Sequence, residues 1–334
     1  MNPNQLSRIV LRGFKSIREC DLELKELNVL IGPNGAGKSN FLGFFRLIQQ
    51  MLESKLQLFV SKHGGPDSLL HFGRKKTKTL DAELYFGNNG YKFSLEPTKD
   101  NRMMFAAEKF WWNQHGDWDI GSGHFETQVE NEKEHTLIYK YTVPAMKRWR
   151  LYHFHDTSEN ASVKQQHGIN DNDYLRSDAQ NLAAFLFLLR KLFPTHYQRI
   201  VKTVRVVAPF FGDFHLRPNP DNNDQIELEW LEKGEDIPFK AHLLSDGTLR
   251  FICLATVLMQ PENLQPQMIL IDEPELGLHP FAIHLLAAMI RSASKNRQIV
   301  ISTQSPDLLN EFQSADVIVA DRNEGRTNLH RLDD

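Results

Sequence analysis

The chain has few of the features that mark a secreted or membrane-embedded protein. It has two cysteines in 334 residues, Cys20 and Cys253, which are too few for a disulfide framework or a cysteine-based zinc site. Its longest wholly apolar run, Leu182 to Leu189, is too short to cross a bilayer. The N-terminus shows no signal-peptide pattern. We therefore expect a cytoplasmic protein with reduced cysteines and no membrane partner.

The chain also has no excess of charge and no obvious repetition. Its formal net charge is −3, so any contact with nucleic acid would need a local basic patch. We find no internal repeat, no low-complexity tract and no heptad run, which argues against a solenoid or a coiled coil. Hydrophobic residues make up 41% of the chain, enough for a packed core.

A phosphate-binding pattern occurs at residues 32–39. The segment reads Gly-Pro-Asn-Gly-Ala-Gly-Lys-Ser and fits G-x-x-x-x-G-K-[ST] at every fixed position. A short apolar run at 27–31 precedes it, and helical apolar spacing follows it at 40–48. Glycine amides and a helix N-terminus both attract phosphate groups. Lys38 is expected to reach the β- and γ-phosphates and Ser39 to ligate Mg²⁺. The expected nucleotide-binding residues of this loop are Asn34, Gly35, Ala36, Gly37, Lys38, Ser39 and Asn40.

Two adjacent carboxylates, Asp272 and Glu273, end the apolar segment 268–271. In P-loop NTPases the first acid at such a strand end helps to hold Mg²⁺, and this role fits Asp272. A second acid directly after it is suited to polarising a water molecule, so Glu273 is the candidate general base. The alternative is that the two carboxylates are only solvent-exposed charges at the end of a strand. The P-loop upstream favours the first interpretation, with ATP and Mg²⁺ as cofactors.

A third motif, Leu-Ser-Asp-Gly-Thr at 244–248, places Ser245 27 residues before Asp272 (272 − 245). A small hydroxyl and a glycine amide at a helix start can donate to a γ-phosphate, which the helix dipole also favours. The same residues form an ordinary cap and turn, so the motif is weak alone. Its order and spacing relative to the other two motifs favour a nucleotide role for Ser245 and Gly247.

The order of elements predicts an α/β protein with a discontinuous core. After residue 240, helices at 246–260, 280–294 and 306–312 alternate with short apolar segments, which implies a parallel sheet with right-handed crossovers. We expect the ATPase core to comprise 1–60 and 240–334, with a mixed or parallel sheet. The remainder, 61–239, is expected to be an inserted β-rich and helical arm or lid.

Within that insertion, two local signals are specific enough to test. Residues 136–141, Thr-Leu-Ile-Tyr-Lys-Tyr, are rich in β-forming residues and are expected to be a strand. Ser177 to Gln180 matches a capping box and is expected to open a helix at 181–193, which Pro194 ends.

Together the motifs resemble the RecF/SMC-like branch of ABC ATPases, including stand-alone OLD-like and RecF-like heads. They are, in chain order, Phe14-Lys15-Ser16-Ile17, the P-loop with Asn40, the 244–248 motif, and Asp-Glu-Pro-Glu-Leu-Gly-Leu-His-Pro at 272–280. The resemblance implies an ABC-type P-loop fold and a head-to-tail homodimer, or a higher oligomer, that holds ATP between subunits.

In such a dimer Lys38 and Ser39 would bind one ATP in cis. Ser245 and Gly247 of the other copy would cap its γ-phosphate. Residues 275–279 resemble the D-loop at the dimer seam, and Gln165 or Gln166 is a candidate for the Q-loop glutamine.

One position departs from this family's pattern. Its switch histidine usually stands in Ser-Thr-His-Ser-Pro, whereas here Gln304 stands between Thr303 and Ser305. Glutamine can hydrogen-bond a γ-phosphate but cannot carry a proton. Gln304 therefore stays a catalytic candidate, and slow turnover is expected.

Three further groups of residues have a structural interpretation that outweighs the functional one. His153 and His155 could bind a metal, but no third ligand is evident. Trp111, Trp112 and Trp118 could stack bases, but aromatic residues are common on half-buried sheets. The basic cluster Arg74 to Lys78 could grip phosphates, and a solvated loop is the alternative.

The sequence thus predicts a Mg²⁺-dependent ATPase whose ATP-driven closure serves DNA repair or anti-phage defence. It shows neither the coiled coil of SMC-type relatives nor the nuclease domain of OLD-type relatives, so we expect a separately encoded effector, such as a nuclease or toxin. DNA is a second candidate partner. The alternative is a slow-turnover, nucleotide-gated scaffold that restrains such an effector. A small-molecule kinase is disfavoured by Glu273 and by the 244–248 motif.

Overall fold

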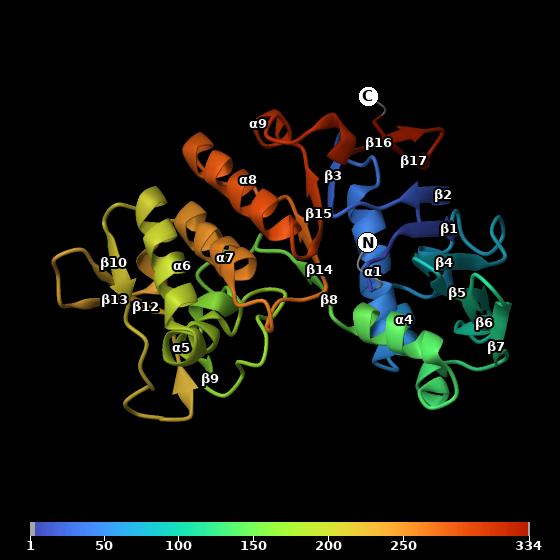
Figure 1. Cartoon of the computed structure of the whole chain (residues 1–334), viewed down its shortest axis with the longest axis horizontal. Helices are drawn as coiled ribbons and strands as arrows, with labels where there is room; N and C mark the ends of the chain where they lie inside the picture. The colour runs from blue at the N-terminus through green and yellow to red at the C-terminus, as the bar shows by residue number, and fades with distance from the viewer. Residues whose placement is uncertain (1–3, 333–334) are drawn as a thin grey trace.

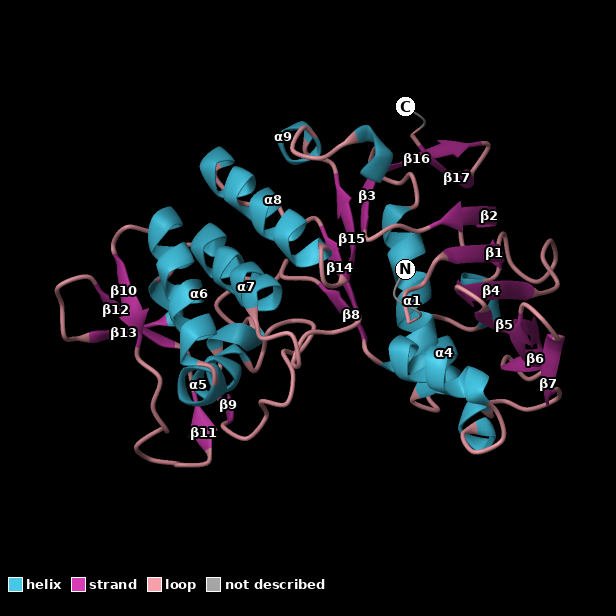
Figure 2. Cartoon of the chain, in the orientation of Figure 1, coloured by secondary structure: helices cyan, strands magenta, loops and turns pink. Residues whose placement is uncertain are grey.

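The structure, a computed structural model that describes residues 4–332, is built around two six-stranded sheets with helix α1 between them (Figures 1 and 2). The first sheet has the order β17-β16-β3-β15-β14-β8. Its strands run parallel except for β17, which pairs antiparallel with β16. In chain order they are β3 (Leu27–Ile31), β8 (Trp149–Tyr152), β14 (Met268–Asp272), β15 (Gln298–Thr303), β16 (Val317–Asn323) and β17 (Arg326–Arg331).

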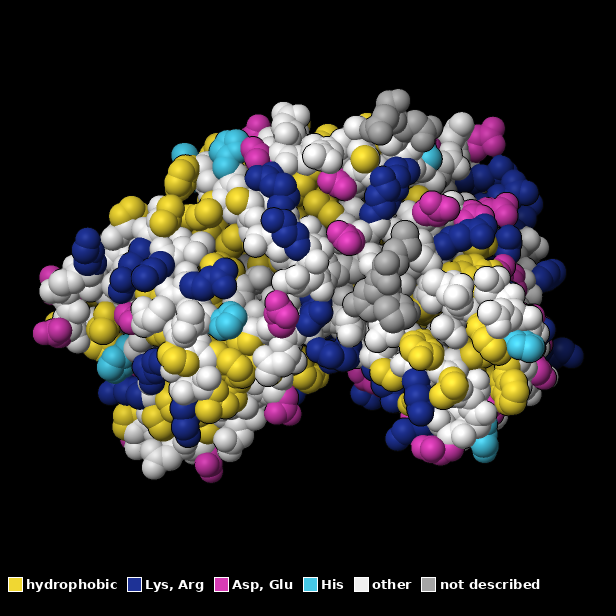
Figure 3. All heavy atoms as spheres, viewed as in Figure 1, with side chains coloured by type: hydrophobic (Ala, Val, Ile, Leu, Met, Phe, Trp, Pro, Cys, Tyr) yellow, Lys and Arg dark blue, Asp and Glu magenta, His cyan; other side chains and the backbone are white. Residues whose placement is uncertain are grey.

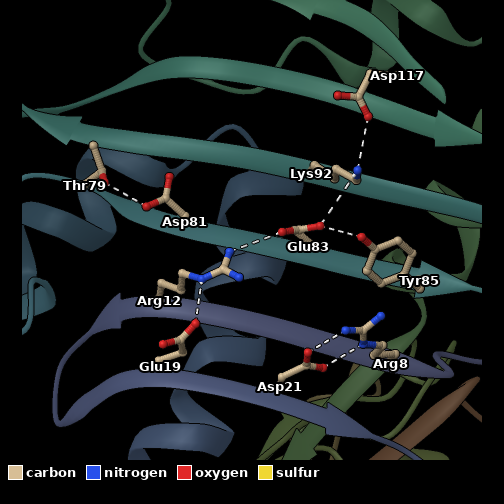
Figure 4. A network of polar contacts seen from close by, with 10 residues as sticks. All are labelled: Arg8, Arg12, Glu19, Asp21, Thr79, Asp81, Glu83, Tyr85, Lys92 and Asp117. Carbon is tan, nitrogen blue, oxygen red and sulfur yellow. Dashed lines mark hydrogen bonds and ion pairs between the residues drawn. The ribbon is translucent and has the colours of Figure 1, made fainter.

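The second sheet is antiparallel and has the order β2-β1-β4-β5-β6-β7. Its strands are β1 (Arg8–Phe14), β2 (Ile17–Glu23), β4 (Leu80–Phe86), β5 (Asn89–Pro97), β6 (Met103–Trp112) and β7 (Gly116–Gly121). Buried and partly exposed residues alternate strictly along β4, as expected for a sheet with one covered face. The outer face carries cross-strand ion pairs, such as Arg12 with Glu19 and Glu83, and Lys92 with Asp117 (Figure 4).

The helices contribute to the two hydrophobic cores on either side of the parallel sheet. The N-terminal and middle helices are α1 (Lys38–Leu52), α2 (Leu56–Lys62), α3 (Pro66–Leu69) and α4 (Leu137–Lys147). The later helices are α5 (Leu182–Leu192), α6 (Pro194–Val207), α7 (Asp246–Met259), α8 (Pro280–Ser294) and α9 (Pro306–Leu309). Short strands complete the lobe on the left of Figure 1, namely β9 (His167–Gly168), β10 (Phe211–Phe214), β11 (Gln225–Ile226), β12 (Glu229–Glu232) and β13 (Pro238–Lys240).

The two faces of strand β14 show how the parallel sheet divides the hydrophobic core. Ile269 and Ile271 pack in the core that contains α5 to α8. Met268 and Leu270 point to the opposite face, into the core formed by α1, α4 and the antiparallel sheet. Because successive side chains of a strand alternate between faces, a strand covered on both sides must be apolar throughout. This requirement explains the uninterrupted apolar run before Asp272.

Helix α1 joins the two sheets through three aromatic residues that are fully buried: Phe41, Phe44 and Phe45. Phe44 stacks on Phe93 of β5 with ring centroids 6.4 Å apart. Phe45 meets Trp149 of β8 edge-on with ring centroids 5.2 Å apart. The glycine loop that precedes α1 is thereby held at a fixed position relative to both sheets.

The alternation predicted after residue 240 is confirmed, since α7, β14, α8, β15, α9 and β16 follow one another in that order. The strand prediction for 136–141 was wrong, because these residues begin helix α4. Thr136 is its N-cap and accepts a hydrogen bond from the Ile138 amide at 3.2 Å. Ile138, Thr142 and Met146 are buried at helical spacing, so packing against the core overrides the β-forming tendency of this segment.

Helix α5 begins as predicted to within one residue, but not through a capping box. Its N-cap is the buried Asn181, whose side chain does not cap the helix. The Asn181 side chain instead accepts a hydrogen bond from the Arg176 amide and donates to the carbonyl oxygens of Asp171 and Tyr174. It therefore fixes the preceding loop.

The division into a core of 1–60 and 240–334 and an insertion of 61–239 stays a prediction. Two pairings bear on where its boundaries would be drawn. Strand β4 pairs with β1 and extends the antiparallel sheet, and β8 pairs with β14 at the edge of the parallel sheet. Both strands belong to the predicted insertion. Among the described residues, no helix combines the length and apolar character needed to cross a membrane.

Candidate nucleotide site

The glycine loop connects the end of β3 to the start of α1, as the sequence predicts. Gly35 and Gly37 have φ values of 79° and 108°, in the left-handed region that favours glycine. A Cβ atom on Gly37 would lie 2.0 Å from the Thr327 hydroxyl oxygen, and one on Gly32 would lie 2.1 Å from the Ala320 carbonyl oxygen. The glycines are therefore required both by the loop conformation and by the close approach of β16 and β17.

A chain of hydroxyl hydrogen bonds fixes this loop from two distant parts of the sequence. The Asn40 side chain donates to Ser16 Oγ at 2.7 Å, and Ser16 donates to Thr327 Oγ1 at 2.7 Å. Thr327, which is 1% exposed, donates in turn to the Ala36 carbonyl oxygen at 2.7 Å. The turn between β1 and β2 and the hairpin of β16 and β17 thus set the shape of the glycine loop.

Lys38 is buried at the first position of α1. Its ammonium group donates to the carbonyl oxygens of Gly32 and Pro33, at 2.6 and 3.3 Å. Burial lowers the pKa of Lys38, and the nearby carboxylates of Glu273, Asp272 and Glu275 act in the opposite direction. The ammonium group is therefore held inside the loop, where a bound phosphate would meet it.

Ser39 and Asp272 are 233 residues apart in sequence and meet in the folded chain. The Ser39 hydroxyl donates to Asp272 Oδ2 at 3.2 Å. Ser302 of β15 donates to the other carboxylate oxygen, Asp272 Oδ1. The structure thus brings together the two residues that the sequence predicts as magnesium ligands, and adds Ser302 beside them.

Glu273 follows Asp272 with a φ of 46°, a left-handed conformation that is uncommon for glutamate and is found where local strain is maintained by surrounding structure. The Gln304 side-chain amide donates to its carboxylate. Glu275 accepts hydrogen bonds from the Thr303 hydroxyl, at 2.6 Å, and from the Gln304 amide, at 3.1 Å. The two glutamates thus hold the side chain and the backbone of Gln304 in place.

The 244–248 motif contacts the loop that follows β14 through Gly247. Ser245 is the N-cap of α7 and accepts a hydrogen bond from the Thr248 amide at 3.3 Å. A Cβ atom on Gly247 would lie 2.4 Å from the Gly277 carbonyl oxygen. Arg250 donates to the carbonyl oxygens of Leu276 and His155. The 244–248 motif therefore packs directly against residues 275–279.

The two histidines after β8 lie near the site, but they do not act as a pair. His155 Nε2 lies 3.1 Å from the Asp272 carbonyl oxygen. Nδ1 of His153 is buried without a hydrogen-bond partner, and burial, together with the positive charge of Arg46, lowers the His153 pKa. Across residues 4–332, no cluster of three or more His, Cys, Asp or Glu side chains could hold a metal ion.

The remaining candidates lie elsewhere. Gln165 and Gln166 are exposed, and the Gln165 side chain donates to the Glu159 carbonyl oxygen. Trp111 packs on Tyr85 of the antiparallel sheet, with ring centroids 5.0 Å apart. Arg74 pairs with Asp67.

Sequence reasoning missed Thr327 and Ser302 as residues of the site, and it assigned Glu275 only to the segment that resembles the D-loop. Ser302 and Glu275 stand within motifs that the sequence displays, so their side chains could have been considered. Thr327 has no sequence signal, because its contact with Ala36 arises only from the folding of a distant hairpin.

Comparison with known proteins supports the interpretation of this geometry. Residues 27–310 match a family model described as "AAA domain, putative AbiEii toxin, Type IV TA system". The chain belongs to this AAA-domain family. The "Old nuclease" of Escherichia phage P2 is 23% identical, over 94% of this chain and 58% of that protein. The chain thus spans a little over half of the length of this curated relative.

Solved structures with the same fold include heads of Smc proteins. A Smc head bound to the C-winged helix domain of ScpA gives a TM-score of 0.64 at 16% identity, over 97% of both chains. A Smc head with an extended coiled coil, bound to the C-terminal domain of ScpA from Pyrococcus furiosus, gives a TM-score of 0.62 at 15% identity, over 97% of this chain and 95% of that one. The predicted fold class, an ABC-type P-loop ATPase fold, and the resemblance to RecF/SMC-like and OLD-like ATPases are confirmed.

The hydroxyl chain predicts that Thr327 is needed for the shape of the glycine loop. Thr327→Val keeps the side-chain shape but removes the hydrogen bonds to Ala36 and Ser16. We expect this substitution to lower the free energy of unfolding by about 1–3 kcal/mol and to weaken ATP binding, because a buried acceptor loses its partner. Denaturant unfolding and calorimetric titration with ATP measure the two effects.

Thr327→Ser is the matched control, since it restores the hydroxyl and is expected to recover most of the affinity for ATP. Equal affinities in Thr327→Val and the unmodified protein would show that the hairpin does not shape the loop.

Proposed function

We propose that the chain binds ATP with Mg²⁺ and hydrolyses it. The observation that carries this proposal is the contact between Ser39 at the end of the glycine loop and Asp272 at the end of β14, with Glu273 directly beside it. These residues would supply a phosphate cradle, a pair of oxygen ligands for a metal and an acid for water activation at one edge of a parallel sheet. This is where ligands bind in open α/β folds.

The donor set and the local charge fit a magnesium ion. A serine hydroxyl and a carboxylate are the hard oxygen ligands that Mg²⁺ takes, with water and phosphate oxygens completing its coordination. Three carboxylates face the single ammonium of Lys38 in this site. Without a divalent cation, their excess negative charge would repel a triphosphate. Mg²⁺ would offset that repulsion and polarise the terminal phosphate.

Glu273 is the residue best placed to activate water. It stands next to the proposed metal ligand, and its carboxylate accepts a hydrogen bond from Gln304. Gln304 has no titratable group, so it would orient the carboxylate or the γ-phosphate rather than transfer a proton. Proton removal then falls to Glu273 alone, which is the reason to expect slow turnover.

We propose further that the ATP site is completed by a second copy of the chain. Gly247 lies in the first turn of α7 and packs against Gly277, so a displacement of the loop after Glu273 would be passed on to it and to the N-cap Ser245. In a head-to-tail dimer these residues would cap the γ-phosphate held by Lys38 of the other copy. Hydrolysis would then depend on dimer closure.

We propose that such a cycle serves DNA repair or anti-phage defence, together with a separate effector. The relative from phage P2 is named a nuclease, and the chain matches 58% of its length, which supports a nuclease as the kind of effector. A Smc head with the same fold binds a winged-helix domain, which supports protein docking on the head. A nucleotide-gated scaffold that restrains its effector is the second candidate, and Gln304 favours it.

Direct DNA binding has weaker support. Arg74 is paired with Asp67, which leaves Lys75, Lys76 and Lys78 as the exposed charges of the basic cluster. On the face drawn in Figure 3, Lys and Arg side chains are spread among Asp and Glu rather than gathered in one patch. Binding to a duplex requires several phosphate contacts at once, so three lysines would give only weak, strongly salt-dependent affinity.

Glu273→Gln tests the chemistry. The substitution keeps the side-chain shape and the contact with Gln304 but removes the base, so phosphate release should fall by about 10²–10⁴-fold. ATP affinity should persist, because the phosphate cradle and the metal ligands are unchanged. Steady-state phosphate release and calorimetric titration measure the two quantities.

Glu235→Gln, at an exposed position in the turn between β12 and β13, is the matched control and should leave both quantities unchanged. An undiminished rate in Glu273→Gln would remove this residue from the mechanism.

Mixing two inactive variants tests the composite site. Lys38→Ala removes the phosphate-binding ammonium, and Ser245→Arg places a bulky cation where the neighbouring γ-phosphate would lie, so neither variant alone should hydrolyse ATP. In mixed dimers one site would combine an intact glycine loop with an intact Ser245, and activity should partly return.

The control is a chain that carries both substitutions. Mixed with either single variant, it forms no complete site and should restore nothing. If no ratio of the two single variants restores ATP hydrolysis, the idea of independent ATP sites built from two subunits is contradicted.

A further inference from the structure

Phe72 has two features that the packing of the core does not explain. Its side chain is 58% exposed, although phenylalanine is normally buried. Its backbone has a φ of 55°, in the left-handed region that residues with a bulky side chain rarely adopt. An exposed ring in an uncommon conformation indicates a role outside the core, because neither feature contributes to burial.

The loop that carries Phe72, between α3 and β4, is anchored firmly through the residue before it. His71 is 5% exposed, and its amide donates to the Gly13 carbonyl oxygen at 3.0 Å. Its ring Nδ1 lies 2.7 Å from the Lys15 carbonyl oxygen, and its own carbonyl accepts a hydrogen bond from the Thr77 hydroxyl at 2.5 Å. The centroid of its ring lies 4.3 Å from that of Phe72. The exposed ring is therefore held in place before any ligand arrives.

Two routes connect this ring to the glycine loop. On one side the His71 ring is hydrogen-bonded to the Lys15 carbonyl oxygen. Lys15 precedes Ser16, which accepts the hydrogen bond from Asn40. On the other side the ring contacts the turn between β16 and β17. A Cβ atom on Gly325 would lie 3.0 Å from Phe72 Cζ.

The second route also indicates how the Phe72 ring is related to the glycine loop. Gly325 lies two residues before Thr327, a span of about 7 Å at most in extended chain. Thr327 donates directly to the Ala36 carbonyl oxygen of the glycine loop. The ring is therefore linked to the glycine loop through the turn between β16 and β17.

We propose that Phe72 is a stacking platform for the base of the nucleotide whose phosphates occupy the glycine loop. This inference rests on the proposed function of that loop. A purine base presents a π-face of the size of the exposed ring, and bases stack on aromatic side chains in this manner. Because the ring is already held by His71 and Gly325, binding would immobilise little additional structure.

The test compares a ligand that has a base with one that has none. Calorimetric titrations with ATP and with inorganic tripolyphosphate, both with Mg²⁺, are made on the unmodified chain and on Phe72→Ala. The substitution is expected to weaken ATP binding by about 5- to 100-fold, the effect typical of removing one stacking side chain. Tripolyphosphate binding should not change, since the cradle is untouched.

Phe72→Tyr keeps the π-face and should bind ATP as the unmodified chain does. Phe210→Ala removes an aromatic ring that is 42% exposed on the other lobe, and should affect neither ligand. Should Phe72→Ala fail to fold, Phe72→Leu removes the aromatic face while keeping apolar bulk, and the same loss of ATP affinity is expected.

An unchanged affinity for ATP in Phe72→Ala would overturn the stacking platform while leaving the nucleotide site in place, and would point to a protein partner for the exposed ring. An equal loss of ATP and tripolyphosphate binding would also overturn it, because the ring would then act on the cradle. An unmodified chain that binds neither ligand would overturn the nucleotide site itself, and the platform with it.

Discussion

The parallel pairing of β3, β15 and β14 is the constraint on which the candidate site depends. In this register Ser302 of β15 lies opposite Leu30 of β3 on one side and Asp272 of β14 on the other. Parallel strands end at the same edge of a sheet, so the loop after β3 and the carboxylates after β14 must meet there. The contact between Ser39 and Asp272 follows from that register. A shift by one residue would reverse the faces of β14 and move Asp272 out of register with Ser302.

The same sheet also explains how the glycine loop is held in place. Its two faces are covered by separate cores, and α1 lies in one of them between the parallel and the antiparallel sheets. The loop is then closed from outside by Thr327 near the end of the described chain and by Ser16 near its beginning. A chain of hydroxyl groups of this kind specifies one conformation only when every member has a hydrogen-bond partner, as each has here. The shape of the glycine loop and the folding of the hairpin of β16 and β17 are therefore physically linked.

Sequence could predict those parts of the site whose signals are local. The glycine loop, the acids after β14 and the Ser-Asp-Gly start of α7 each lie within a few residues, and their backbone context follows from the same residues. The residues that complete the site could not be found in this way. Thr327 reaches it only through the folding of a distant hairpin and has no sequence signal. Ser302 stands in a recognisable motif, but it meets Asp272 only through strand pairing. Helix α4 was missed for a related reason. Its first residues favour strands, but they form a helix because one side of that helix packs on the core.

The most direct test of this account is phosphate release from ATP by the unmodified chain, measured with Mg²⁺ and again with the metal removed by a chelator. Because three carboxylates interact with Lys38, we expect the site to need a divalent cation both to accept the triphosphate and to polarise it. We predict slow but measurable release with Mg²⁺ and none after chelation. Release that continues at the same rate without the metal, or a chain that neither binds nor hydrolyses ATP in its presence, would contradict the assignment of Ser39, Asp272 and Glu273.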